Sequence, residues 1–151
     1  GNRLEPRPRI LITGCPIGGA AEKVVRAIEE NGGWVVGYEN CTGAKATEMQ
    51  VNEEGDVYDA LTDKYLAIGC SCISPNTQRL NLLSQMIDEY QADGVIDVIL
   101  QACHTYAVES LAIKRHVRQQ HDIPYMAIET DYSNSDIGQL NTRVSAFIEM
   151  M

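Results

Sequence analysis

The sequence has few basic residues. It contains 12 Lys and Arg against 21 Asp and Glu, which gives a formal net charge of -9. The Lys and Arg residues are scattered, and this argues against a surface that neutralises the phosphates of DNA or RNA. The sequence also lacks any run of the roughly 18 to 20 apolar residues that a membrane span requires. We therefore expect a soluble protein with no nucleic acid and no membrane among its partners.

Features of secreted proteins are also missing. The number of cysteines is odd, and they do not form the paired framework of an extracellular domain. They lie at positions 15, 41, 70, 72 and 103. No apolar stretch near the start resembles a signal peptide. These features favour a reducing cytoplasm, in which the thiols remain free for metal or redox work.

The length and the opening residues predict the domain organisation. A chain of 151 residues has the usual size of one domain. Its first residues, "GNRLEPRP", are rich in Pro and Arg and contain no apolar pattern. We expect residues 1–8 to be a linker from a missing upstream domain and residues 9–151 to form a single α/β domain.

Apolar runs alternate with segments of helical periodicity. β-branched and apolar runs predict strands at 9–14, 34–39, 95–100 and 125–130. Helical spacing of apolar residues predicts helices at 20–31, 56–69, 76–91, 106–119 and 135–151, the second of them capped by Asp56. This alternation indicates a doubly wound α/β fold of the flavodoxin or Rossmann type, with a mainly parallel sheet of about four strands and helices on both faces.

Several reactive or polar residues directly follow the predicted strands. Ligands bind at the carboxyl ends of the strands in such sheets. We therefore expect one crevice at that edge, formed by Cys15, Cys41, Cys103, His104, Asp131, Tyr132 and Ser133. Asp131 either caps the last helix, orders its own loop or contacts substrate. The spacing alone does not show whether the loop of Cys70 and Cys72 reaches the same edge.

The motif "GCPIGGA" at 14–20 does not match the common nucleotide-binding loops. It lacks the G-x-G-x-x-G pattern of a dinucleotide site and the Lys-Ser/Thr of a P-loop. A thiolate at Cys15 would be favoured by the following helix N-terminus, which suits a reactive or metal-bound thiol. The alternative is a half-buried residue in a tight turn, and both interpretations remain open.

The "CSC" motif at 70–72 can place two sulfurs on one metal centre, or it can be a solvent loop with two idle thiols. It is not the C-x-x-C of a thioredoxin-type dithiol. Thiolates without a histidine array favour an iron-sulfur cluster, while a closed four-thiolate zinc site stays open. We interpret His104 as a helix-cap or surface residue, and His116 and His121 as exposed.

Four segments together resemble a known family. They are "GCPIG", "NCTG", "DGVIDVILQACHTYAVES" and "IPYMAIETDYSNSDIGQLNTRVSAFIEM". Nearly the whole chain is similar to the C-terminal part of the D-component family of 2-hydroxyglutaryl-CoA dehydratase, which includes benzoyl-CoA reductase subunits. The resemblance implies a 4Fe-4S cluster held by three cysteines, two from the preceding half of the polypeptide and one matching Cys103.

The resemblance also implies a reaction and partners. An ATP-hydrolysing iron-sulfur activator protein, which alone binds ATP, would supply an electron for the radical dehydration of an (R)-2-hydroxyacyl-CoA. A second dehydratase subunit or a homodimer mate would complete the lyase, and the isolated chain would be catalytically incomplete.

Cys70 and Cys72 depart from the three-cysteine pattern. With Cys15 and Cys103 they are candidate cofactor-binding residues, and relatives with a larger double-cubane cluster are ATP-driven reductases of small molecules. A non-catalytic α/β assembly domain is the remaining alternative.

Overall fold

The computed structural model describes residues 6–16 and 18–151. The helices and strands follow one another as β1 (Arg9–Gly14), α1 (Gly18–Glu30), β2 (Trp34–Glu39), the short 3₁₀ helix η1 (Ala44–Ala46), α2 (Val57–Leu66), α3 (Thr77–Tyr90), β3 (Gly94–Leu100), α4 (His104–Gln120), β4 (Tyr125–Thr130) and α5 (Ile137–Ile148). Residues 1–5 of the predicted linker lie outside the described residues, and residues 6–8 carry no helix or strand.

The four strands form one parallel sheet in the order β2-β1-β3-β4. The chain moves outward from β1 to β2 and then returns to the other side of β1 to form β3. The strand order therefore reverses between β1 and β3, which is the switch point where doubly wound sheets bind ligands. The predicted α/β fold is confirmed.

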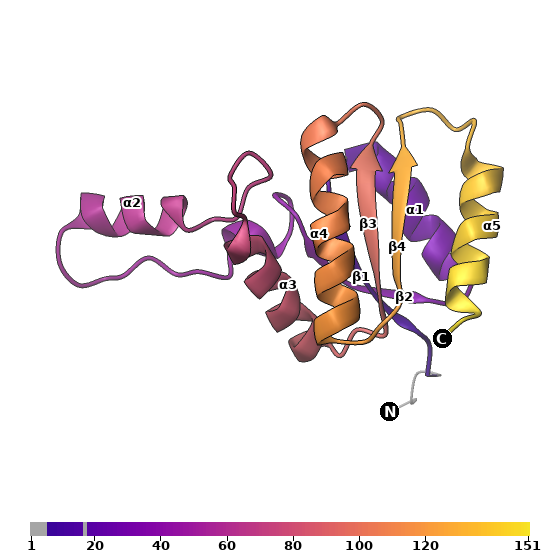
Figure 1. Cartoon of the computed structure of the whole chain (residues 1–151), viewed down its shortest axis with the longest axis horizontal. Coiled ribbons are helices and arrows are strands. Elements are labelled where there is room, and N and C mark those ends of the chain that lie inside the picture. Colours follow the sequence, from indigo (N-terminus) through magenta and orange to yellow (C-terminus); the bar gives the residue numbers. More distant parts are fainter. Residues whose placement is uncertain (1–5, 17) are drawn as a thin grey trace.

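Helices cover both faces of the sheet, as Figure 1 shows. On one face, α1 and α5 bury Val24 and Val144 against Ile10 and Ile12. On the other face, α3 and α4 bury their apolar sides against Leu11 and its neighbours. Alternate residues of β1 thus enter different cores, as the two-residue repeat of a strand requires.

Several predicted helix boundaries differ from the structure, and α1 begins at Gly18, two residues before the predicted start. α2 begins after Asp56, whose carboxylate accepts hydrogen bonds from the backbone N–H groups of Tyr58 and Asp59, as expected of an N-cap. It ends at Leu66 and not at Gly69. α4 begins at His104, two residues before the predicted start, because Cys103 takes the N-cap position. α5 is shorter than predicted at both ends.

The interpretation of His116 and His121 as exposed residues is wrong. Both are partly buried between α3 and α4, because their rings pack around one hydroxyl group. Nε2 of His116 lies 2.6 Å from Oγ of Ser84, and Nε2 of His121 lies 2.9 Å from the same atom. Their sequence positions near the end of a polar helix concealed this contact.

α2 and the segments beside it project away from the sheet (Figure 1). Ala60 is its buried residue, whereas several large apolar side chains of this helix are exposed. They are Val57, Tyr58, Leu61, Tyr65 and Leu66. The predicted helix is confirmed, although none of its described residues belongs to either hydrophobic core of the sheet.

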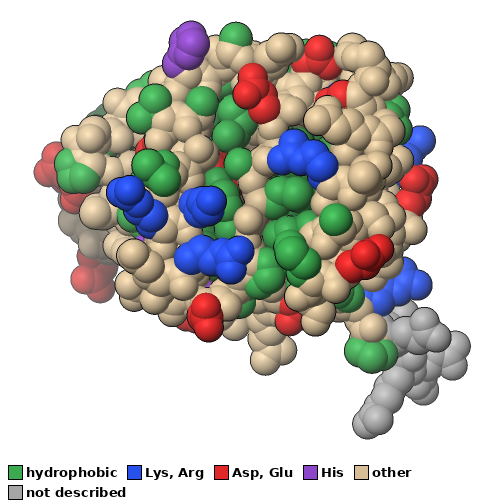
Figure 2. All heavy atoms as spheres, turned by 45° about the vertical axis from the view of Figure 1, so that its right-hand side comes forward, with side chains coloured by type: hydrophobic (Ala, Val, Ile, Leu, Met, Phe, Trp, Pro, Cys, Tyr) green, Lys and Arg blue, Asp and Glu red, His purple; other side chains and the backbone are tan. Residues whose placement is uncertain are grey.

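Charges of both signs are interspersed on the face shown in Figure 2, where Lys and Arg side chains surround a strip of apolar groups. Among the helices of the described residues, none is both long and apolar enough to cross a membrane.

Candidate site at the carboxyl edge of the sheet

Cys15 lies at the end of β1, where Gly14 allows β1 and β3 to approach closely. Gly14 has φ +110°, and a Cβ atom there would lie 2.2 Å from the carbonyl oxygen of Val98. The Cys15 N–H donates to that same oxygen at 2.7 Å. The side chain is only 4% exposed, and burial raises the pKa of its thiol to about 11. The structure thus places a protonated thiol in the core at the switch point.

Cys103 has the opposite environment, although it belongs to the same edge. It is the half-buried N-cap residue of α4, after a turn in which Ala102 has φ 65°. The backbone N–H of Tyr106 lowers the pKa of the Cys103 thiol most strongly, and the Thr105 hydroxyl adds to the effect. Hydrogen bonding by the Cys15 thiol also favours the Cys103 thiolate. Cys103 is therefore suited to act as an anionic ligand or nucleophile.

The loop that carries the "CSC" motif lies beside the first turn of α4. The Ser71 hydroxyl donates to Oγ1 of Thr105 at 3.4 Å, and that oxygen is 3.6 Å from Sγ of Cys103. Cys70 is half-buried and Cys72 is exposed, and all five cysteines are free thiols. A side-chain hydrogen bond with Cys70 raises the pKa of the Cys72 thiol, and the electrostatic effect of Cys70 adds to the shift. Thr105 thus connects this loop to Cys103.

Cys41 and His104 are exposed residues of the same edge. Cys41 follows β2 in a turn where the Asn40 side chain accepts hydrogen bonds from Thr42. His104 is the first residue of α4 and does not cap it, since Cys103 has that position. The two lie on the loops after β2 and β3, as the sequence predicts.

Asp131 and its neighbours are held by α1. The carboxylate of Asp131 accepts the Ser133 N–H at 2.7 Å and lies 3.8 Å from Nζ of Lys23. Lys23 also donates to the Ser133 carbonyl oxygen and to the Asp136 carboxylate. Of the roles considered, Asp131 orders its own loop, while Asp136 is the N-cap of α5. Tyr132 is largely exposed.

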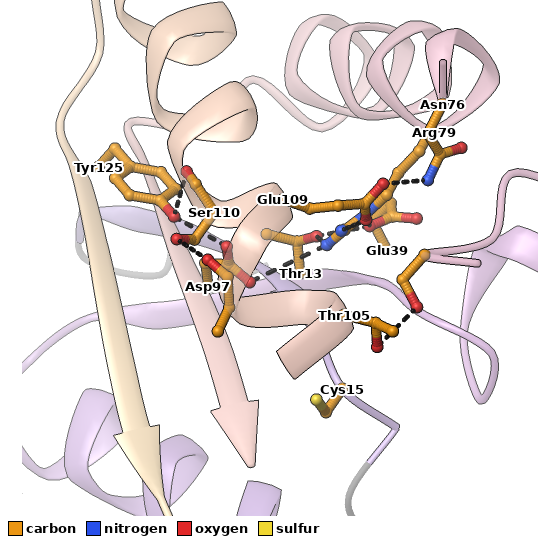
Figure 3. A network of polar contacts seen from close by, with 12 residues as sticks. Thr13, Cys15, Glu39, Asn76, Arg79, Asp97, Thr105, Glu109, Ser110 and Tyr125 are labelled. Atoms are coloured by element: carbon orange, nitrogen blue, oxygen red, sulfur yellow. Dashed lines mark hydrogen bonds and ion pairs between the residues drawn. The ribbon is translucent and has the colours of Figure 1, made fainter. Parts of the chain in front are cut away.

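A buried ionic network next to this edge was missed by the sequence analysis. At its centre is Arg79 of α3, which Figure 3 shows between side chains of β1, β2 and α4. Arg79 donates to Glu39 at 3.1 Å, to Thr13 at 2.9 Å and to Glu109 at 2.5 Å. Lys45 adds a second cation, 3.2 Å from Glu39. The Arg79 pKa is raised by its acidic neighbours despite burial, so its charge is retained.

Asp97 of β3 extends the network. Its Oδ2 atom lies 2.8 Å from the Tyr125 hydroxyl, which also contacts the Ser110 carbonyl oxygen at 3.1 Å. Oδ1 lies 3.9 Å from Arg79 and has no hydrogen-bond partner among the described residues. Burial raises the pKa of the Asp97 carboxyl group. The charged residue inside the apolar run "GVIDVIL" was the one sequence signal of this network.

A cleft of about 570 Å³ opens between residues 71–77 and α4. Its wall includes His104 and Thr105 from the first turn of α4 and Asn76 and Arg79 from the start of α3. It therefore runs from the ionic network to the residues next to Cys103.

The described residues do not form a complete metal site. No group of three or more Cys, His, Asp or Glu side chains in that part of the chain could hold one metal ion. The arrangement offers Cys103, whose thiol has a lowered pKa, with the Cys15 thiol and the loop of Cys70 and Cys72 nearby.

The sequence was compared with known proteins. The profile of the family "2-hydroxyglutaryl-CoA dehydratase, D-component" matches residues 1–151. The chain is 85% identical over its whole length to the Escherichia coli (strain K12) protein named "Putative dehydratase subunit YjiM", of which it covers 39%. It is 26% identical to the (R)-phenyllactyl-CoA dehydratase beta subunit of Clostridium sporogenes, with 98% of this chain and 40% of that protein aligned.

A third relative is a benzoyl-CoA reductase subunit of Thauera aromatica. It is 25% identical, with 87% of this chain and 30% of that protein aligned. The chain therefore spans about two fifths or less of the length of these curated relatives.

Proposed function

The chain belongs to the D-component family of 2-hydroxyglutaryl-CoA dehydratase, and from that membership we propose that it is part of an iron-sulfur subunit of an ATP-activated (R)-2-hydroxyacyl-CoA dehydratase-type enzyme. Since it spans about two fifths of the length of its curated dehydratase relatives, the proposed lyase activity is that of the assembled protein. We infer that the assembled protein works in the cytoplasm with an ATP-hydrolysing iron-sulfur activator and with a second subunit or a second copy.

Cys103 is the observation that carries this proposal. A cluster ligand must be a thiolate, and the Cys103 pKa is lowered by the Tyr106 N–H and the Thr105 hydroxyl. It also lies at the switch point of the sheet, where ligands bind. Cys103 fits one ligand of a 4Fe-4S cluster, and two cysteines from the preceding half of the longer polypeptide would complete the set. The cluster, when bound, would supply the low-potential electron for dehydration.

The other residues of this edge hold the Cys103 thiolate in place. Cys15 remains protonated, and its thiol favours the thiolate on Cys103. Arg79 joins the ends of β1 and β2 to α4 through hydrogen bonds, and this fixes the helix whose N-cap is Cys103. A rigid ligand position is what a tuned cluster requires from its surroundings.

A double-cubane reductase is the second candidate, and one contact favours it. Ser71 lies 3.4 Å from Thr105, so the loop of Cys70 and Cys72 is anchored next to Cys103. Two further thiolates at this position suit a larger cluster better than a single 4Fe-4S cluster. The relative from Thauera aromatica is named as a reductase subunit, which keeps this class open.

The iron content of the assembled full-length protein separates the two candidates. The protein is purified anaerobically, and iron, sulfide and the EPR spectrum are measured with and without its activator and ATP. The dehydratase requires about four irons per subunit and the double-cubane reductase about eight. Dehydration of an (R)-2-hydroxyacyl-CoA that depends on activator and ATP supports the first candidate. No iron at all would contradict both, and would leave the role of a non-catalytic assembly domain.

A further inference from the structure

The cleft between residues 71–77 and α4 reaches the candidate cluster ligand. Thr105 forms part of its wall, and Oγ1 of Thr105 is 3.6 Å from Sγ of Cys103. A molecule in the cleft would therefore have one end next to Cys103. The volume of about 570 Å³ lies within the usual range of small-ligand pockets, roughly 300 to 1,000 Å³.

The wall of the cleft is mostly apolar. It is lined by Ile73, Pro75, Leu80, Val108, Ala112 and Ile113. Val108 is 78% exposed and Ile73 is 48% exposed, so much of this apolar surface faces water. Covering this surface with a hydrocarbon group would be favourable.

The charged side chains of the wall do not favour an anion. Among the described Lys and Arg residues Arg79 alone lines the wall, and each of its three guanidinium nitrogens already donates to Glu39, Thr13 or Glu109. Glu109 itself adds a carboxylate.

Asn76 adds an acceptor to the same wall. Its Nδ2 atom donates to Glu109 at 2.6 Å, and this fixes the orientation of the amide because a carboxylate can only accept. Its Oδ1 is buried and has no hydrogen-bond partner among the described residues. A ligand carboxylate beside Glu109 would lose hydration and meet a charge of the same sign.

We propose that this cleft binds the acyl side chain of the substrate, and that the preferred side chain is an uncharged aliphatic or aryl group and not one that carries a second carboxylate. This inference rests on the proposed function, because it assumes an acyl-CoA substrate whose reacting end lies at Cys103. The wall of this chain then determines which 2-hydroxyacyl-CoA is accepted.

The test measures binding in the absence of turnover. The assembled full-length protein without activator is titrated calorimetrically with hexanoyl-CoA, 3-phenylpropanoyl-CoA, glutaryl-CoA and CoA itself. Hexanoyl-CoA and 3-phenylpropanoyl-CoA should bind at least about tenfold more tightly than glutaryl-CoA, because a carboxylate is costly to desolvate in the cleft. Equal or tighter binding of glutaryl-CoA, or no binding of any thioester, would overturn the proposal.

A variant that fills the cleft and a matched control variant locate the site. Ala112→Phe fills the cleft from an exposed position on α4, and should weaken hexanoyl-CoA binding by about tenfold or more while leaving CoA binding unchanged. Ala107→Phe introduces the same side chain at an exposed position of α4 outside the wall and should leave both unchanged. Val108→Trp is a second filling variant if Ala112→Phe does not fold. Unaltered hexanoyl-CoA binding in a folded filling variant would place the acyl group elsewhere.

Turnover distinguishes failure of this inference from failure of the proposed function. With activator and ATP, faster dehydration of 2-hydroxyglutaryl-CoA than of 2-hydroxyhexanoyl-CoA would overturn the side-chain preference and leave the dehydratase function intact. If neither is dehydrated by protein with its full iron content, the dehydratase function fails, and with it the assignment of the cleft to this substrate.

Discussion

Arg79 and Glu109 join α3 to α4 through a contact of 2.5 Å between Nη1 and Oε2, at side chains that are 1% and 15% exposed. Glu39, which is fully buried, accepts from Nε of the same guanidinium. The cation thus compensates acidic groups from two separate elements of the fold.

Removing Arg79 should leave Glu109 without its cation and Glu39 with Lys45 alone. We expect Arg79→Ala to lower the free energy of unfolding by about 3 to 5 kcal/mol, measured by urea denaturation. Arg26→Ala is the matched control, since Arg26 pairs with Glu22 on the surface, where both side chains are mostly exposed. It should change the free energy by less than about 0.5 kcal/mol. A similar effect of both variants would show that the network does not hold the edge together.

Burial raises the pKa of the Asp97 carboxyl group, although Arg79 and the Tyr125 hydroxyl act in the opposite direction. Tyr125 has one hydroxyl proton, which it donates either to Asp97 at 2.8 Å or to the Ser110 carbonyl oxygen at 3.1 Å. A raised pKa means that folding favours the neutral form of the Asp97 carboxyl group relative to the unfolded chain. Its stabilising contribution is full below the unfolded pKa and is lost as the pH rises through the folded pKa.

The wild type should lose free energy of unfolding as the pH rises, and Asp97→Asn should remove the part of that loss that comes from ionisation of Asp97. Urea denaturation of wild type and variant from about pH 5 to about pH 9 measures this difference. The variant should gain stability relative to wild type as the pH rises, because its amide oxygen still accepts from the Tyr125 hydroxyl and the amide cannot ionise. Asp97→Ala, which lacks that acceptor, should be less stable than Asp97→Asn throughout. Parallel pH profiles for wild type and Asp97→Asn would indicate that the carboxyl group is ionised over the whole range.

His116 should give the opposite pH dependence. Burial lowers its pKa, with a further contribution from His121, so the folded protein favours the neutral ring. The stability that this provides is present above the unfolded pKa of about 6.5 and is lost as the pH falls through the folded pKa. An NMR titration of the imidazole protons should find His116 below the value of a model peptide. A His116 pKa at or above about 6.5 would contradict the packing around Ser84.

Gly14 should not tolerate an added side chain, whereas Gly138 should tolerate alanine. Gly14→Ala would force a Cβ against Val98 and Asp97 in a backbone conformation that L-residues rarely adopt, and we expect a loss of about 2 kcal/mol or more. Gly138 lies in α5, where an added Cβ would meet nothing within 4 Å, so Gly138→Ala should stabilise the protein by about 0.5 to 1 kcal/mol. Thermal unfolding of the two variants compares them directly. Equal midpoints would mean that β1 and β3 are not held together at Gly14.

The fold could be predicted from local sequence patterns. The runs at 9–14 and 125–130 have the apolar, β-branched character of buried strands, and the structure has β1 and β4 within the same limits. Asp56 was recognised as a cap because the capping contacts lie within three residues of it. Such short-range signals are independent of tertiary packing.

The ionic network could not be predicted in the same way. Arg79 contacts Thr13 and Glu39, which lie 66 and 40 positions away in the sequence. Those pairs exist only once α3 packs on the sheet, so no local pattern shows them. The two interpretations of Cys15 remained open for the same reason, since its burial depends on how closely β1 approaches β3.

The role of Cys103 as a cluster ligand is the central claim, and the iron content of single variants of the assembled full-length protein tests it most directly. Cys103→Ser should lower the iron and sulfide bound after anaerobic purification to less than about half of the wild-type amount, since a hydroxyl replaces a thiolate ligand. Cys41→Ser makes the same change at an exposed thiol of this edge and should retain the wild-type iron content. Wild-type iron and an unchanged EPR spectrum in folded Cys103→Ser would contradict the claim.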